Sequence, residues 1–170
     1  GTQKWLVGMQ GLAFIYIDEE LQKKMIPAAV GWLSVENAWN LLDYKLDLKT
    51  SANVFQGGTL NTFGIYAFNT SLNLFNDFGF DNVESEVLSN TKYFINKLKA
   101  IGLDCVLSNC RDEDVAGILT INPENPEIVF KKLENKNIVC SFREGFLRFA
   151  PHFYNTHYEI DKVVEELQKI

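Results

Sequence analysis

The apolar run Leu12–Ile17 is the sequence feature that most restricts the folds open to this chain. Its residues are consecutively apolar and lack the alternation that marks a strand with one face in water. Such a run is typical of a strand buried on both faces of an α/β sheet. The acidic residues Asp18, Glu19 and Glu20 follow it and predict a short helical turn that ends before Pro27.

The middle of the chain predicts a loop followed by two helices. Ala28–Gly58 has no regular period, so we expect it to be mostly loop. Asn61 or Thr62 is expected to cap a helix that ends at Gly79. The sequence Asp81–Glu84 reads as a capping box that opens the next helix.

The C-terminal part predicts a mixture of helices and short strands. Strands are expected over Asp104–Leu107, Val115–Ile121, Ile138–Phe142 and Phe146–Phe149. A helix should follow the cap and proline at Asn125 and Pro126, and a capping box from Thr156 to Glu159 should open the last helix. We therefore expect an α/β chain with an α+β C-terminal lobe.

Composition excludes several classes of partner. The chain has 170 residues, of which 46% are hydrophobic, enough for one sizeable core or two small ones. The formal net charge is −6 and the basic residues are scattered, so we expect no nucleic-acid partner. The apolar stretches are too short to span a bilayer, and we expect no membrane partner.

The cysteines indicate a reducing compartment. Cys105, Cys110 and Cys140 are an odd number without a Cys-x-x-Cys pair, and His152 and His157 are the only histidines. We expect no metal site and a cytoplasmic location.

Three features of the sequence are candidates for chemistry. These are Lys4 ahead of the apolar run, the turn Gly57-Gly58-Thr59, and Arg148 inside the strand Phe146–Phe149. Each also has a purely structural interpretation: a solvated lysine, an ordinary turn, and an arginine paired with a structural acid. Strand alternation allows Arg148 to point inward or to lie on an outer face.

Taken together, these segments resemble one family. QKWLVGMQGLAFIYID resembles the Schiff-base lysine segment of the class V aminotransferases, a pyridoxal-phosphate (PLP) family that includes cysteine desulfurases, isopenicillin-N epimerase-like proteins and kynureninases. FQGGTLNTFGIYAFNTSLNLFNDFG resembles the later Gly-Thr segment of that family. FLRFAPHFYNTHYEIDKVVEEL resembles its C-terminal signature. The three segments occur in the family's order and cover essentially the whole chain.

The resemblance implies an architecture. The fold would be the C-terminal portion of a fold type I PLP-dependent transferase. Residues 1–60 would form the tail of the large PLP-binding domain, residues 61–80 a connecting helix, and residues 81–170 the small α+β domain. The enzyme would be a homodimer, and its partners would include its own missing N-terminal half, without which this chain should be inactive.

The resemblance also assigns roles to residues. Lys4 would form the internal aldimine with PLP and act as the catalytic base. Gly58 and Thr59 would bind the cofactor phosphate of the neighbouring subunit, and Trp32 would lie near it. Arg148 would grip the α-carboxylate of an amino-acid substrate, since a guanidinium fork matches a planar carboxylate.

The reaction type stays open at this stage. The family resemblance allows transamination, racemisation or elimination on an amino acid. A desulfurase needs a nucleophilic cysteine on a loop ahead of the arginine, but Cys140 reads as an inert buried thiol, so we do not expect sulfur transfer. The alternative is a non-catalytic α+β interaction domain that keeps the fold of the family without its chemistry.

Overall fold

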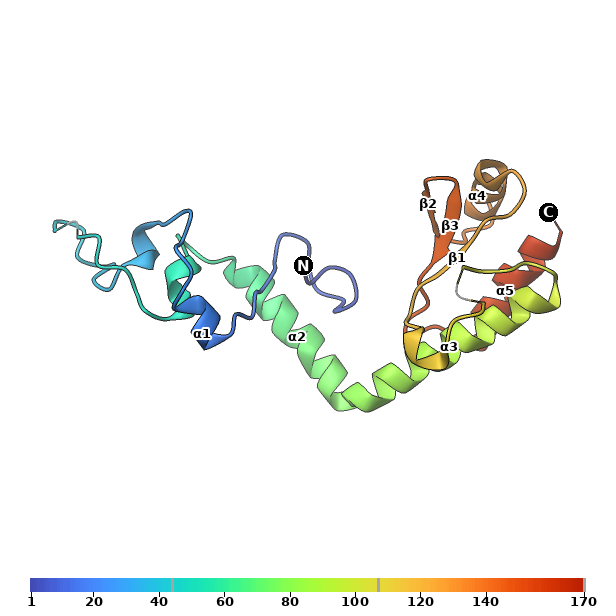
Figure 1. Ribbon diagram of the computed structural model, residues 1–170, viewed down its shortest axis with the longest axis horizontal. Helices are drawn as coiled ribbons and strands as arrows, with labels where there is room; N and C mark the ends of the chain where they lie inside the picture. The colour runs from blue at the N-terminus through green and yellow to red at the C-terminus, as the bar shows by residue number, and fades with distance from the viewer. Residues whose placement is uncertain (44, 107, 170) are drawn as a thin grey trace. The chain divides into compact units, whose positions relative to one another are not determined.

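The chain divides into two compact units. A computed structural model describes residues 1–43, 45–106 and 108–169 (Figure 1). Unit 1 is Gly1–Leu74 and unit 2 is Phe75–Ile170. No helix among the described residues is long and apolar enough to cross a lipid bilayer.

Unit 1 is largely irregular. It contains the short helix α1 (Glu19–Gln22), two 3-10 turns, η1 (Trp32–Ser34) and η2 (Ala52–Phe55), and most of the long helix α2 (Thr62–Phe78). The Asp18 carboxylate caps α1 by accepting hydrogen bonds from the backbone N–H groups of Glu20 (3.0 Å) and Leu21 (3.2 Å). The predicted helical turn after the apolar run and the predicted loop around η1 and η2 are confirmed.

The predicted buried strand over Leu12–Ile17 is wrong. This segment forms no strand, and the side chains of Phe14, Ile15 and Tyr16 are 62%, 82% and 86% exposed. A strand needs a neighbouring strand to satisfy its backbone N–H and C=O groups. The described part of unit 1 offers none to this segment, because its one bridge joins Val35 to Leu48.

A single glycine joins α2 to the first helix of unit 2, α3 (Phe80–Ala100). Gly79 has φ = 91°, so the predicted helix end at this residue is confirmed. The predicted capping box at Asp81–Glu84 is wrong, because α3 begins at Phe80 with Gly79 as its N-cap. The Asn82 amide instead donates to the Phe78 carbonyl oxygen at 2.7 Å, which satisfies a free acceptor of α2.

Unit 2 contains a three-stranded antiparallel sheet. Its strands are β1 (Leu119–Ile121), β2 (Ser141–Arg143) and β3 (Phe146–Phe149), in the order β1-β3-β2. Glu144 and Gly145 form the turn between β2 and β3, with φ of 49° and 84°. Positive φ at both residues matches a type I′ turn, whose twist suits a hairpin.

The strand predictions are confirmed in part. The predicted strand Phe146–Phe149 is β3. β1 is the C-terminal end of the predicted strand Val115–Ile121. β2 begins near the end of the predicted strand Ile138–Phe142 and extends one residue beyond it. The predicted strand Asp104–Leu107 is reduced to one bridge between Cys105 and Ile121, and Leu107 lies outside the described residues.

Three helices pack on one face of this sheet. They are α3, α4 (Pro126–Glu134) and α5 (His157–Gln168), and Figure 1 shows α3 and α5 side by side. Both later helices begin where the sequence predicts, α4 at a proline and α5 at a capping box between Thr156 and Glu159. The core contains Phe94, Ile95, Leu98, Cys105, Val115, Leu119, Ile121, Val129, Leu133, Leu147, Phe149, Ile160, Val164 and Leu167.

Asn90 anchors the connection between β3 and α5. Its side chain is 2% exposed, and its amide donates to the carbonyl oxygens of His152 (3.1 Å) and Asn155 (2.9 Å). The Asn155 side chain accepts from the His152 N–H at 2.9 Å. These bonds satisfy buried polar groups and fix the path of the chain that leaves β3.

A charged cluster links the outer surfaces of α3 and α5. The Tyr93 hydroxyl donates to the Asp161 carboxylate at 2.9 Å, and the Lys97 ammonium lies 2.8 Å from the same group. The Tyr93 ring also stacks on His157 with ring centroids 3.8 Å apart. The bonds from Lys97 and Tyr93 hold the pKa of Asp161 below its ordinary value.

Replacing Asp161 with Asn is expected to lower the melting temperature at neutral pH by at most about 4 °C, since exposed ion pairs are weak. A carboxyl whose pKa is lower in the folded state stabilises the fold above its unfolded pKa and loses that effect as the pH falls through the folded pKa. The difference in melting temperature between wild type and D161N should therefore shrink below about pH 4. Thermal unfolding followed by circular dichroism measures it.

The matched control is Glu84→Gln, which changes an exposed carboxylate of α3 that forms no ion pair with a described residue. A difference between wild type and D161N that stays constant down to acidic pH, or that E84Q reproduces, would contradict the assigned role of Asp161.

Candidate functional site

Lys4 lies in a tight turn of unit 1. The Val7 N–H donates to the Lys4 carbonyl oxygen at 3.0 Å and closes the turn. Val7 has φ = 54°, a conformation that β-branched residues rarely adopt. The Lys4 side chain is exposed, and its amine forms no ion pair or hydrogen bond with a described residue.

Thr2 closes the loop that carries this turn. Its buried hydroxyl donates to the carbonyl oxygens of Met9 (3.0 Å) and Leu12 (3.2 Å). Its own carbonyl oxygen accepts from the Gly8 N–H at 2.8 Å. A Cβ on Gly8 would lie 2.7 Å from the Thr2 Cβ, so this approach requires glycine. The hydrogen bonds of Thr2 and the close approach of Gly8 therefore help to hold the loop around Lys4.

Trp32 and Gly58 are neighbours in space. Gly31 packs so tightly on Gly57 that a Cβ on Gly31 would collide with the Gly57 carbonyl oxygen. This contact places the Trp32 indole next to Gly58, where a Cβ would lie 3.7 Å from Trp32 Nε1. Thr59 follows with an exposed side chain. Within the described residues, neither the indole N–H nor the Thr59 hydroxyl forms a hydrogen bond.

Ser34 and Lys49 hold the η1 turn in this position. The buried Ser34 hydroxyl accepts from the Gly31 N–H at 3.1 Å, and the Ser34 N–H donates back to the Gly31 carbonyl oxygen at 3.0 Å. The Lys49 ammonium donates to the Leu33 carbonyl oxygen at 2.7 Å. The Gly-Trp element is therefore fixed by polar contacts within the loop.

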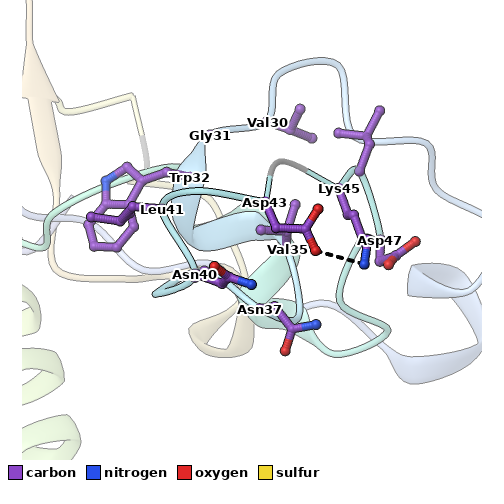
Figure 2. Close-up of a pocket in the computed structure, with 12 residues that line it drawn as sticks. Val30, Gly31, Trp32, Val35, Asn37, Asn40, Leu41, Asp43, Lys45 and Asp47 are labelled. Atoms are coloured by element: carbon purple, nitrogen blue, oxygen red, sulfur yellow. Dashed lines mark ion pairs between the residues drawn. The ribbon is translucent and has the colours of Figure 1, made fainter.

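A pocket of about 300 Å³ lies beside Trp32, as Figure 2 shows. The Trp32 ring meets the Trp39 ring edge to face, with centroids 5.0 Å apart. Asp43 and Lys45, which form an ion pair at 2.8 Å, also line it. Sequence reasoning treated Ala28–Gly58 as a loop and missed this pocket, because an irregular segment has no period that reveals which residues converge.

Arg148 lies on the face of the sheet that points away from the core. Its neighbours Leu147 and Phe149 are buried, whereas Arg148 is half-buried. Thr120 of β1 and Ser141 of β2 pair directly with Arg148, so their side chains share its face. The sequence had left two orientations possible, and the structure has the outward one.

Arg148 has no acidic partner in the part of the chain that the structure describes. The structural interpretation in which an Asp or Glu pairs with it therefore finds no support among these residues. The hydroxyls of Thr120 and Ser141 are likewise without side-chain hydrogen bonds to described residues. The guanidinium and two hydroxyls form a row of polar groups available to a carboxylate.

The structure brings some of the expected site residues of unit 1 together. Trp32, Gly58 and Thr59 form one group of unit 1. Lys4 belongs to the same unit but forms no hydrogen bond with that group. Arg148 belongs to unit 2.

Cys140 lies just ahead of β2, where a desulfurase would need its nucleophile. The thiol is half-buried, and burial together with the nearby Glu134 charge raises its pKa. A raised pKa lowers the fraction of reactive thiolate, which is the direction expected of an unreactive thiol. The full burial expected from the sequence is only partial.

Comparison with known proteins finds relatives that match nearly the whole chain. An uncharacterized aminotransferase, YcbU of Bacillus subtilis (strain 168), is 29% identical over 167 residues, which are 98% of this chain and 43% of that protein. A kynureninase of Shouchella clausii (strain KSM-K16) is 26% identical over 175 residues, covering 99% of this chain and 41% of that protein. The chain therefore spans less than half the length of these curated relatives.

A solved structure shows the same fold. The cystine C-S lyase C-DES, in complex with its reaction product cysteine persulfide, superposes with a TM-score of 0.84 at 17% identity, covering 98% of this chain and 44% of that one. This likeness confirms the expected fold class, part of the fold type I architecture of PLP-dependent enzymes.

The sequence profile of the family described as aminotransferase class-V matches residues 1–163. The match includes every candidate residue of both units. The chain belongs to the class V aminotransferase family.

Proposed function

We propose that the chain is the C-terminal part of a PLP-dependent enzyme that acts on an amino acid by transamination, racemisation or elimination. Pyridoxal phosphate is the cofactor of the family. The single observation that carries the proposal is that the polar groups of Lys4, Trp32, Thr59 and Arg148 are uncommitted to other described residues. Packing alone requires none of the side chains of Lys4, Thr59 and Arg148.

The residues around Gly58 fit a phosphate group. The close contact of Gly31 with Gly57 leaves the Trp32 N–H next to a backbone position without a side chain. A phosphate needs N–H and O–H donors that can approach closely, and Trp32, Gly58 and Thr59 supply them. We assign these three residues to the phosphate held mainly by the neighbouring subunit of a homodimer.

Lys4 is the proposed catalytic residue. When bound, PLP supplies an electron sink that stabilises negative charge at the substrate α-carbon. Lys4 holds the cofactor through its amine and moves the proton at that carbon. The exposed amine, in a turn fixed by Thr2 and Gly8, supports this role.

Arg148 is the proposed residue for the α-carboxylate of the substrate. A guanidinium offers two parallel N–H donors to the two carboxylate oxygens, which fixes orientation as well as binding. The hydroxyls of Thr120 and Ser141 flank it in register and can donate to the same group.

The chain is proposed to work within a longer protein. Its relatives are more than twice its length, and many large apolar side chains of unit 1 are exposed, including Trp39 at 79% and Leu42 at 96%. Residues 1–60 would complete a large PLP-binding domain with the N-terminal half, residues 61–80 would connect, and residues 81–170 would form the small domain. Three free cysteines favour the cytoplasm.

The second candidate function is a non-catalytic interaction domain with the same fold. It is favoured by the same exposed apolar surface, because such surface is typical of protein interfaces. It requires no role for Lys4, which is how the two proposals are separated.

Borohydride reduction of the full-length protein with PLP should leave a pyridoxyl group on Lys4, found by peptide mass spectrometry. The variant Lys4→Arg should lose the label, and its turnover should fall at least about 100-fold because the base is removed. Lys24→Arg, an exposed lysine near α1, should keep the label. A folded protein with excess PLP and no label on Lys4 would favour the interaction domain instead.

Gly31→Ala should weaken PLP binding about 10-fold, as expected for losing a hydrogen bond to a charged group. The new Cβ would collide with the Gly57 carbonyl oxygen and displace the Trp32 N–H from Gly58. Absorbance titration of the full-length apoprotein with PLP measures the affinity.

The control for this variant is Gly57→Ala on the other side of the same contact. Its Cβ would lie 3.5 Å from the Gly31 nitrogen, an ordinary van der Waals distance, so its effect should be smaller. Equal losses in G31A and G57A would show that the close approach of Gly31 is not what positions the donor.

Arg148→Gln should raise the KM for the amino-acid substrate about 10-fold or more, because a charged hydrogen bond is lost. Arg148→Lys should recover part of the loss, since it keeps the charge without the fork. Steady-state kinetics measures both variants. Arg111→Gln, an exposed arginine paired with Asp114, is the control, and a KM for R148Q equal to that of R111Q would refute the assignment.

A further inference from the structure

We propose that Arg143 is a second anion-binding residue beside Arg148, and that the site takes an amino acid with an acidic side chain. The proposal rests on the proposed function of Arg148 as the residue that holds the α-carboxylate. Arg143 was not among the residues that the sequence indicated. The pairing register of β2 with β3 identifies it, because this register places Arg143 on the same face of the sheet as Arg148.

The hairpin between β2 and β3 places both arginines on one face. Ser141 pairs with Arg148 and Arg143 pairs with Phe146, so all four side chains lie on the side opposite the core. With Thr120 they make up the open face of the sheet. Arg143 is therefore diagonal to Arg148 on the neighbouring strand, one row nearer the turn.

The helices leave this face uncovered. The C-terminal half of α3, through Phe94, Ile95 and Leu98, and the buried residues of α4 and α5 belong to the cluster that contains Leu147 and Phe149, on the other face. On the open face, Arg143 is exposed, Phe146 is 37% exposed and Arg148 is half-buried. A ligand of unit 2 can therefore reach both guanidinium groups.

The two arginines lack a counter-charge within the described chain. The protein has a formal net charge of −6 and three arginines, of which Arg111 forms ion pairs with Glu113 and Asp114. Neither Arg143 nor Arg148 forms an ion pair with a described residue. In so acidic a chain, a pair without a described acid indicates that a ligand supplies the negative charge.

The chemistry of the face favours two carboxylates. Each guanidinium fork matches one planar carboxylate, so two forks in adjoining rows suit two such groups on one molecule. Arg148 takes the α-carboxylate and Arg143 the carboxylate of the side chain. Phe146 pairs with Arg143 and lies two residues from Arg148, where its ring offers an apolar surface to the methylene groups between the carboxylates.

The experiment compares ligands that differ by one carboxylate. Isothermal titration calorimetry of the full-length protein gives dissociation constants for succinate and for butyrate, which has the same chain length and a single carboxylate. We expect wild type to bind succinate about 10-fold tighter or more, as a charged hydrogen bond provides. Arg143→Gln should bring the succinate-to-butyrate affinity ratio close to one, and Arg143→Lys should give an intermediate ratio. Arg148→Gln should weaken both ligands.

Arg111→Gln is the matched control and should keep the wild-type ratio, because its guanidinium is exposed and paired elsewhere. A wild type that binds succinate no tighter than butyrate, or an R143Q protein with the wild-type ratio, would overturn the proposal. Inorganic phosphate that binds more tightly than succinate and depends on Arg143 would also overturn it, in favour of a single tetrahedral dianion.

This test stands apart from the test of the proposed function, because it measures carboxylate binding and not turnover. A label on Lys4 combined with an Arg143-independent ratio would leave the enzyme proposal standing and refute the acidic side chain. An Arg143-dependent ratio without a label on Lys4 would leave a dicarboxylate site on a protein that lacks the proposed PLP chemistry.

Discussion

The antiparallel pairing of β3 with both of its neighbours is the interaction on which unit 2 depends. Because side chains alternate along a strand, Leu147 and Phe149 enter the core while Arg148 lies on the open face. A slip of one residue would bury the guanidinium and expose Leu147. The buried residues of three helices oppose such a slip, since they pack on Leu147 and Phe149. Apolar packing on one face thus fixes the position of Arg148 on the other.

Unit 1 is held together differently. Among its described residues, Ala38 and Val54 are buried hydrophobics, whereas Thr2 and Ser34 are fully buried polar residues that hydrogen-bond the backbone. Apolar burial therefore contributes little to this unit, and close backbone contacts at glycines determine its local geometry. The residues assigned to the cofactor stand in a region whose exposed apolar surface remains available to further polypeptide. This exposed surface supports the proposal that the chain is part of a larger protein.

Local signals in the sequence predicted the helices well, because caps and helix-ending glycines act within one turn. The box at Thr156 and the end at Gly79 are examples. The prediction of a strand over Leu12–Ile17 was wrong because a strand needs a second strand to pair with, and a run of apolar residues does not indicate which segment that would be. The family resemblance supplied the proposed site residues one by one. Their arrangement depends on contacts such as Gly31 with Gly57, between segments far apart in sequence, which no periodicity reports.

The open face of unit 2 carries two positive charges. Arg143 and Arg148 lie diagonally across β2 and β3, and no described acid neutralises them. The opposite face of the same strands is packed by α3, α4 and α5, with Leu147 fully buried, so the strands do not depend on the open face for their stability. A ligand that brings negative charge would neutralise both guanidinium groups. The core therefore explains how the two arginines are tolerated, and the proposed ligand would explain why they are together.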